Sequence, residues 1–301
     1  MGWLYAVLGW MLRMIYSLVN NFGLAIILFT IVIKLLMLPL SIKQQKSMTK
    51  MQRVRPLLEY VQKKYKDDPQ RMQQETMKIY KEEGASPAGG CLPLLIQLPI
   101  LIGLYRVIQR PLTYILKLSA EEINPLKVAV VKNVEKFEGM KASNVSEIDI
   151  FSNIEAIAEK VGKGLTETVE KVAGLNFELF GIDFSQTPDF MGEITWLWLV
   201  PIFAAGTAYL SSYVTRKLQA MPQTEQQQSS MKTMNMIMPM MSAVFCFMLP
   251  AGVGLYWIMS NVVQIAQTIL LDKIFSNKNE EDEIDVEEYF KKDRNHRKKH
   301  Q

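Results

Sequence analysis

The chain has 301 residues, a formal net charge of +4 at pH 7 and a mean hydropathy of +0.05, and 49% of its residues are apolar. No charged side chain occurs in the 39 residues from 233 to 271, which as a helix would measure about 58 Å, roughly two hydrocarbon thicknesses. This distribution excludes a water-soluble enzyme, a disordered chain and a fibrous protein, and it predicts an all-α polytopic membrane protein.

Residues 1–21 are predicted to form an amphipathic helix that lies in the membrane interface. Trp3 and Trp10 belong to its apolar face, and Arg13 interrupts the apolar run. A cleaved signal peptide is the alternative interpretation. The stretch has a single basic residue and no clear small-residue cleavage site, which favours the interfacial helix.

The apolar runs predict five transmembrane helices. The first is 22–40, in which Lys34 is the only charged residue. The last two are separated by the turn signal at Leu249–Gly254. The other four predicted spans are 89–118, 194–215, 233–249 and 250–271.

The charges of the connecting segments predict the orientation. Residues 41–90 carry 11 Lys and Arg against 6 Asp and Glu, whereas residues 119–192 carry 7 against 13. By the positive-inside rule the 41–88 segment is cytoplasmic and the 119–193 segment, in which we expect surface helices, is extracellular. The N-terminus is then outside, and the loop 216–232 and the charged tail 272–301 are cytoplasmic.

The 41–88 segment is predicted to be a helical hairpin that breaks at Asp67–Pro69, with Asp68 capping the second arm. Met48, Met51 and Met72 lie on faces that can meet. A methionine row more often forms a packing seam than a binding surface. Exposed methionines also suit a surface that accepts varied apolar partners, so both interpretations stay open.

The tail carries a basic cluster after an acidic run at 280–288. Its members are Lys291, Lys292, Arg294, Arg297, Lys298 and Lys299. A solvated tail is the default interpretation, and binding to RNA phosphates or to anionic lipid is the alternative.

Residues of common catalytic and metal sites are missing from the predicted spans. Cys91 and Cys246 lie in apolar runs, where cysteine is a small buried hydrophobe, and His296 and His300 are both among the last six residues. No nucleotide-binding motif is present. We therefore predict that the chain is not an enzyme and has no metal site and no cofactor.

Lys34 lies about 10 Å inside the predicted hydrocarbon layer, where a lysine costs several kcal/mol unless it reaches water or polar groups. No Asp or Glu occurs in the predicted spans to neutralise it. Thr30, Gln97 and Asn261 are among the polar residues that could line a wet cavity around it. Such a cavity would attract acidic ligands, whereas snorkelling to the headgroups is the alternative.

These segments resemble the YidC/Oxa/Alb family of membrane protein insertases, specifically the bacterial five-span core. The resemblance rests on Thr30–Leu40, Ser86–Pro99 and Pro250–Trp257 with Ser260–Asn261, in the right order. Only residues 121–192 lack a counterpart. The resemblance implies a multi-pass protein of the bacterial cell membrane that helps newly made proteins enter and fold there.

The resemblance also implies roles for individual residues. Lys34 stands where the family usually has an arginine, in a hydrophilic groove whose neighbourhood includes Thr30, Gln97, Trp257 and Asn261. The hairpin, with Met48, Met51 and Met72, would capture substrate. The partners implied are nascent membrane proteins with acidic or polar outer tails, the ribosome through the tail and the hairpin, the Sec translocon, and membrane lipids.

Two other classes of protein fit five spans. A small transporter or channel would use Lys34 as an anion site, and a structural scaffold would use no site at all. A transporter is expected to have broken helices in two related halves, which the sequence does not show. The basic cytoplasmic hairpin favours the insertase.

Overall fold

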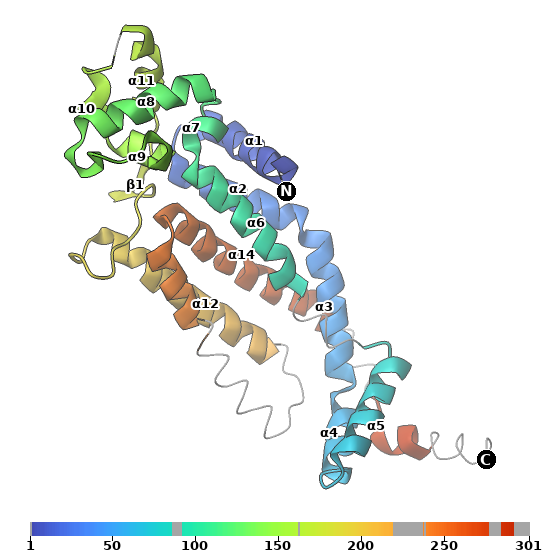
Figure 1. Ribbon diagram of the computed structural model, residues 1–301. Helices are drawn as coiled ribbons and strands as arrows, with labels where there is room; N and C mark the ends of the chain where they lie inside the picture. The colour runs from blue at the N-terminus through green and yellow to red at the C-terminus, as the bar shows by residue number, and fades with distance from the viewer. Residues whose placement is uncertain are drawn as a thin grey trace. The chain divides into compact units, whose positions relative to one another are not determined.

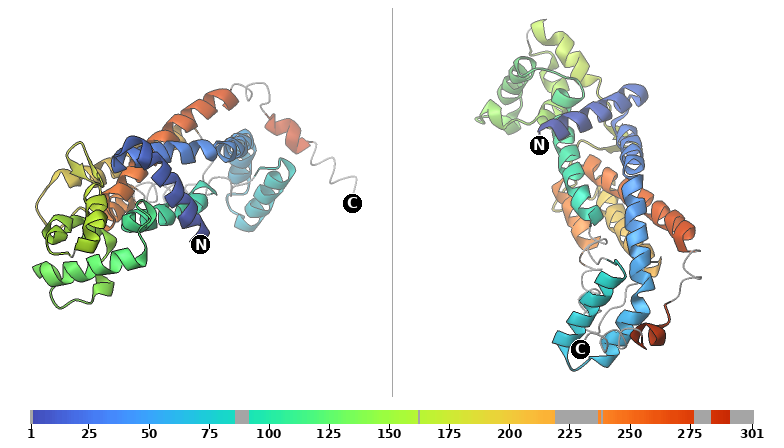
Figure 2. Two further views of the ribbon diagram at one scale, coloured as in Figure 1. Left: turned by 90° about the horizontal axis from the view of Figure 1, so that it is seen from above. Right: turned by 90° about the vertical axis from the view of Figure 1, so that its right-hand side faces the viewer.

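The computed structural model describes residues 2–85, 92–161, 163–218, 237, 239–276 and 284–291. The chain forms two compact units (Figure 1). The first comprises Met1–Lys34, Ile96–Gly206 and Met240–Ser260, and the second comprises Leu35–Leu95, Thr207–Pro239 and Asn261–Gln301. Helices make up nearly all of the regular structure in each view (Figure 2).

Three helices among the described residues are long and apolar enough to cross a membrane. They are Gly2–Val19 (α1), Trp196–Leu218, which contains α12 (Leu199–Leu218), and Ala251–Phe275 of α14 (Ala251–Ser276). A bent pair would make a fourth, and Ile96–Gln109 and Pro239–Met248 are shorter apolar helices. The fold is thus all-α and polytopic, as predicted, whereas the count of five spans stays a prediction.

The bent pair occupies the predicted first span. Helix α2 (Phe22–Leu36) is followed by α3 (Leu38–Arg53), and the two are bent by 57°. Pro39 lies in the first turn of α3. The backbone N–H groups of a first turn have no acceptor within the helix, so a proline there removes no helical hydrogen bond. The proline near the end of the predicted span therefore begins a new helix.

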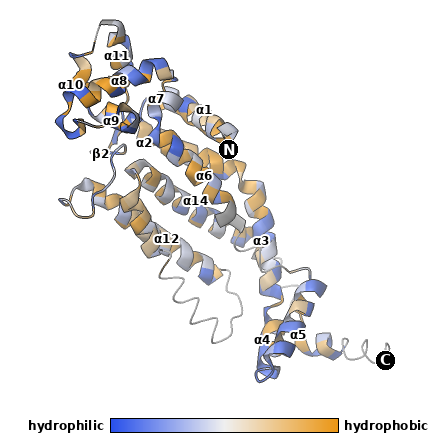
Figure 3. Ribbon diagram, viewed as in Figure 1, coloured by the Kyte–Doolittle hydropathy of each residue, from blue (hydrophilic) through white to orange (hydrophobic). Residues whose placement is uncertain are grey.

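Apolar helices of the first unit meet at glycines. Gly252 of α14 would carry a Cβ only 3.1 Å from Ile26 Cδ1 of α2 and 3.4 Å from Ile108 Cδ1 of α6 (Leu92–Gln109). Gly103 of α6 meets Leu8 of α1 in the same way. Small residues let helix backbones approach closely, which is how helices associate in lipid. Figure 3 shows the apolar colouring of α1, α2 and α6.

The segment between α6 and α12 folds into a small helical region, as expected of its amphipathic pattern. A capping box begins α8 (Ala120–Asn133) at Ser119, and another begins α9 (Glu147–Ser152) at Ser146. The remaining elements are α7 (Pro111–Tyr114), η2 (Glu135–Phe137), η3 (Ala142–Asn144), α10 (Ile154–Ala158), η4 (Lys163–Leu165), α11 (Thr166–Ala173), β1 (Glu178–Leu179), β2 (Ile182–Asp183) and η5 (Trp196–Trp198).

The antiparallel pair β1 and β2 ties this region to the apolar helices. Phe22 N, at the start of α2, donates to Asn176 O at 2.8 Å. Ala251 N and Gly252 N, at the start of α14, donate to Gln186 O at 2.7 Å and to Phe184 O at 2.9 Å. Helices α2 and α14 therefore both begin beside the β pair, and their first N–H groups donate to residues that flank it.

The second unit contains the hairpin. It is built from α3, α4 (Arg55–Lys64) and α5 (Pro69–Glu82). Asp68 caps α5 by accepting a hydrogen bond from Arg71 N at 3.0 Å, and Pro69 occupies the first turn, which confirms the predicted break. The apolar seam of the hairpin is a cluster that includes Leu57, Leu58, Val61 and Ile79.

Candidate functional site

Lys34 and Thr30 lie one turn apart on the same buried face of α2. The Lys34 side chain is 9% exposed and Thr30 is fully buried. Thr30 Oγ1 donates a hydrogen bond to Ile26 O at 2.7 Å within α2. The hydroxyl oxygen can still accept a hydrogen bond from another donor. A lysine inside an apolar unit requires polar partners of this kind.

A second polar group joins α6 to α14 within the first unit. Gln97 Nε2 donates to Tyr256 Oη at 2.6 Å and to Ser260 Oγ at 3.3 Å. Tyr256 is fully buried and Ser260 is 7% exposed. Residues 256 and 260 are one helical turn apart, so they present both hydroxyls on one face of α14 to the same amide.

Helices α2, α6 and α14 share a contact at Gly252, from which the positions of their polar residues can be counted. Helices α2 and α14 both start at the β pair, and Gly252 marks a shared level with Ile26. From that level Lys34 and Ser260 are each eight residues further along their helices, about 12 Å. Helix α6 runs the other way, since Ile108 adjoins Gly252 and Gln97 bonds Ser260. Each of the three helices thus carries a polar side chain beyond the contact at Gly252.

Trp257 and Asn261 follow on α14. Trp257 is half-buried beside Tyr256. Asn261 belongs to the second unit, where its Nδ2 donates to Thr207 Oγ1 at 3.3 Å on α12. Of the five predicted groove residues, four therefore lie in the first unit and one in the second.

Tyr256 and Ser260 were not among the predicted groove residues, although they bond Gln97 directly. A signal for them exists in the sequence. Both are polar, they are spaced by four, and they stand in an otherwise apolar run, which is the pattern of a polar stripe on a buried helix.

The hairpin methionines are packed inside. Met48 is 5% exposed and Met51 is 1% exposed, and Met72 packs half-buried against the same apolar cluster as Met51. Of the two interpretations left open, this geometry is that of a seam. Burial among these side chains also raises the pKa of Tyr80 above its usual value.

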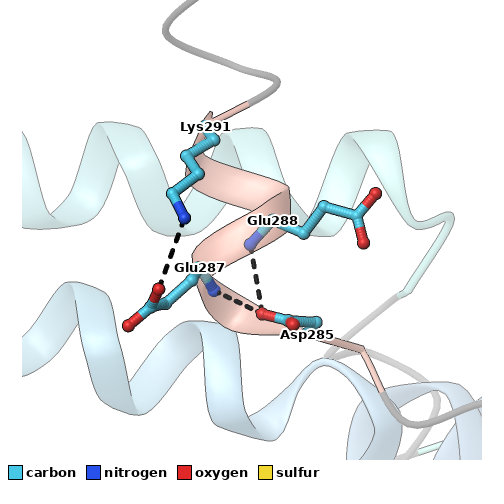
Figure 4. A network of polar contacts seen from close by, with 4 residues as sticks. All are labelled: Asp285, Glu287, Glu288 and Lys291. Carbon is cyan, nitrogen blue, oxygen red and sulfur yellow. Dashed lines mark hydrogen bonds and ion pairs between the residues drawn. The ribbon is translucent and has the colours of Figure 1, made fainter.

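Lys291 is the one predicted tail residue that the structure describes. Its Nζ lies 3.5 Å from Glu287 Oε2 within helical residues 286–291, and Asp285 Oδ1 accepts from Glu287 N and Glu288 N at the start of this helix (Figure 4). Five predicted contact residues lie outside the described residues: Lys292, Arg294, Arg297, Lys298 and Lys299.

Across the described ranges, no group of three or more His, Cys, Asp or Glu side chains is arranged to hold a metal ion. The buried polar groups include amides, hydroxyls, the Lys34 amine and the carboxylates of Glu75 and Glu147. Such groups can donate hydrogen bonds to a polar chain or water and accept bonds from them.

The fold and these residues define a class, the all-α polytopic membrane proteins that bury a cation and hydrogen-bonding side chains between apolar helices. The chain matches the 60Kd inner membrane protein family over residues 14–279, and it belongs to that family.

Several named relatives are membrane protein insertases. "Membrane protein insertase YidC" of Clostridium perfringens (strain 13 / Type A) is 30% identical over 265 residues, which cover 88% of this chain and 84% of that protein. The protein of the same name from Caldanaerobacter subterraneus subsp. tengcongensis is 32% identical over 86% of this chain and 89% of its own length. The chain spans only 36% of the relative from Granulibacter bethesdensis.

Proposed function

We propose that this protein is a membrane protein insertase that eases newly made polypeptides into the cytoplasmic membrane past the buried lysine of α2. Family membership supports the activity, and the observation that carries the mechanism is the burial of Lys34, which is 9% exposed, in the same unit as the Gln97–Ser260 hydrogen bond. A transporter with an anion site at Lys34 has no comparable support among the relatives.

The mechanism is physical and forms no covalent bond. A polar segment that crosses a bilayer must give up its water, which costs several kcal/mol for each unpaired polar group. Side chains such as Gln97 and Asn261 offer replacement hydrogen bonds, and the Lys34 ammonium attracts acidic groups strongly where the dielectric is low. Apolar helices of the substrate then leave for lipid, where burial retains them.

The finer assignments follow from the same proposal. The N-terminus is outside and the C-terminus in the cytoplasm, as the basic hairpin indicates. The hairpin, whose Met48 and Met51 are buried and whose Met72 packs against its seam, receives substrate, and the basic tail contacts the ribosome. The Sec translocon and membrane lipids are further partners.

Charge reversal at Lys34 tests this function. We expect Lys34→Glu to abolish insertion of substrates with acidic outer tails, because like charges repel in a poorly screened site, whereas Lys34→Arg preserves it. The measurement is protease protection of a radiolabelled substrate in proteoliposomes that contain the purified variants.

Arg106→Glu is the matched control. Arg106 is a basic residue of α6 that is exposed, so its reversal should leave insertion within about twofold of the parent. Equal activity of Lys34→Glu and the parent would refute the role of the buried lysine.

A further inference from the structure

The segment 284–291 covers the apolar seam of the hairpin within the second unit. Phe290 is 8% exposed and belongs to the seam cluster, and Ile284, Val286 and Tyr289 pack against it. The rings of Phe290 and Tyr60 have centroids 4.6 Å apart, and Tyr289 Oη donates to Glu82 Oε2. Figure 4 shows helix 286–291 in front of the hairpin helices. The apolar seam of the hairpin is therefore covered by a segment of the same chain.

The charges of the two partners are complementary. The docked segment 284–291 contains three acidic residues and one lysine, whereas residues 41–90 have five more basic than acidic residues (11 − 6). Lys64 Nζ lies 5.3 Å from the ring centroid of Tyr60 and 5.9 Å from that of Phe290, so a cation stands beside the aromatic contact. The docked sequence thus combines acidic residues with apolar ones.

The helix at 286–291 depends on this contact for its stability. Six residues are far fewer than an isolated helix needs in water. Its internal bonds include the Asp285 cap, the bond from Tyr289 N to Asp285 O and one exposed pair, Lys291 with Glu287, and an exposed pair contributes little. Hence the segment folds only while it is docked, and a competitor for the seam would release it.

We propose that residues 284–291 are an internal pseudosubstrate, which occupies the hairpin surface until an acidic and apolar segment of an incoming polypeptide displaces it. The inference rests on the proposed function, because the substrates proposed there have the same chemistry. It adds that capture by the hairpin is competitive, and that the covered seam has to be vacated before substrate binds.

Peptide binding tests the competition directly. The probe is a fluorescein-labelled synthetic peptide with the sequence of residues 280–291, added to the full chain in lipid nanodiscs. Tethering gives the internal segment an effective concentration in the millimolar range, so the parent should bind the probe weakly. We expect Phe290→Asp, which removes the buried ring, to bind it at least tenfold more tightly by fluorescence anisotropy.

Two further variants guard against a folding artefact. Gln70→Ala changes an exposed, uncharged residue of α5 outside the docked segment, and should match the parent. Tyr60→Cys with Phe290→Cys, joined by a bismaleimide in a chain whose native cysteines are alanine, should hold the segment in place and abolish binding. Equal affinity of parent, Phe290→Asp and the crosslinked chain would overturn the proposal.

Substrate capture provides the second readout. A photoreactive residue at position 80, which packs against the seam, should crosslink a ribosome-bound nascent membrane protein about threefold more in Phe290→Asp than in the parent, and less in the bismaleimide-joined chain. Unchanged crosslinking despite tighter peptide binding would overturn the proposal. The Lys34 assay is independent, since a failure of Lys34→Glu to block insertion would reject the groove without altering the peptide result.

Discussion

Single residues provide the buried hydrogen bonds of this membrane protein, and one exposed turn residue has an uncommon backbone conformation. Gln97 satisfies two hydroxyls of α14, and Thr30 turns its hydroxyl onto its own helix. Phe180 has φ 55° and is 90% exposed, and Gly181 beside it has φ 75°. An aromatic residue is uncommon in this left-handed region, because its Cβ approaches the backbone carbonyl.

The turn between β1 and β2 gives a prediction at this scale. Two-residue hairpins with positive φ at both positions prefer Asn-Gly, so Phe180→Asn should raise the free energy of unfolding by about 1 kcal/mol. Gly181→Ala should lower it by about 1 kcal/mol, because alanine gains strain at that φ. Thermal unfolding of the purified variants in detergent measures both, and shifts of the same sign would contradict the strain argument.

Helices are joined in this protein by glycine contacts in the apolar part and by capped breaks in the hairpin. The Asp68 cap follows from local side-chain chemistry, and the sequence pattern predicted it. The 57° bend between α2 and α3 occurs where Pro39 occupies the first turn of α3, and the sequence marks its place but not its angle. Contacts such as Gly254 against Val200 depend on which helices meet, and sequence spacing does not specify that.

Gly254 tests helix packing. A Cβ added there would overlap Val200 Cγ1, and the short valine side chain has no room to turn aside. Gly254→Ala should therefore push α12 and α14 apart and destabilise the chain by about 1–3 kcal/mol.

The rescue variant for this contact is Gly254→Ala with Val200→Ala. It should recover most of the loss, since the removed methyl groups make space for the new one. Thermal unfolding of the two single variants and the double variant gives the coupling energy. Additive losses would show that the two residues do not compete for the same space.

The whole molecule combines apolar helices, an acidic helical region and a basic hairpin along one chain. Residues 119–192 carry six more acidic than basic residues (13 − 7), and residues 41–90 carry five more basic than acidic ones (11 − 6). This asymmetry is typical of a membrane protein with a defined orientation. It also matches the proposed function, in which the basic side receives acidic segments.

Orientation is tested by labelling in intact cells. A cysteine at Asn144, exposed on η3, should react with a membrane-impermeant maleimide added outside. A cysteine at Lys63, exposed on α4, should react only after permeabilisation. The background chain has alanine at both native cysteines. The opposite labelling pattern would reverse the topology and place the hairpin outside.

Composition and periodicity alone determined the membrane class, the helical fold, the break at Asp68 and the unusual position of Lys34, because hydrophobicity, capping and charge act over a few residues. Only the tertiary structure decided that Gln97 bonds Tyr256 and Ser260, that Met51 is buried in the hairpin, and that Phe290 completes the seam. These contacts join residues more than 150 positions apart or depend on which face meets a neighbour, and no local pattern encodes such a choice.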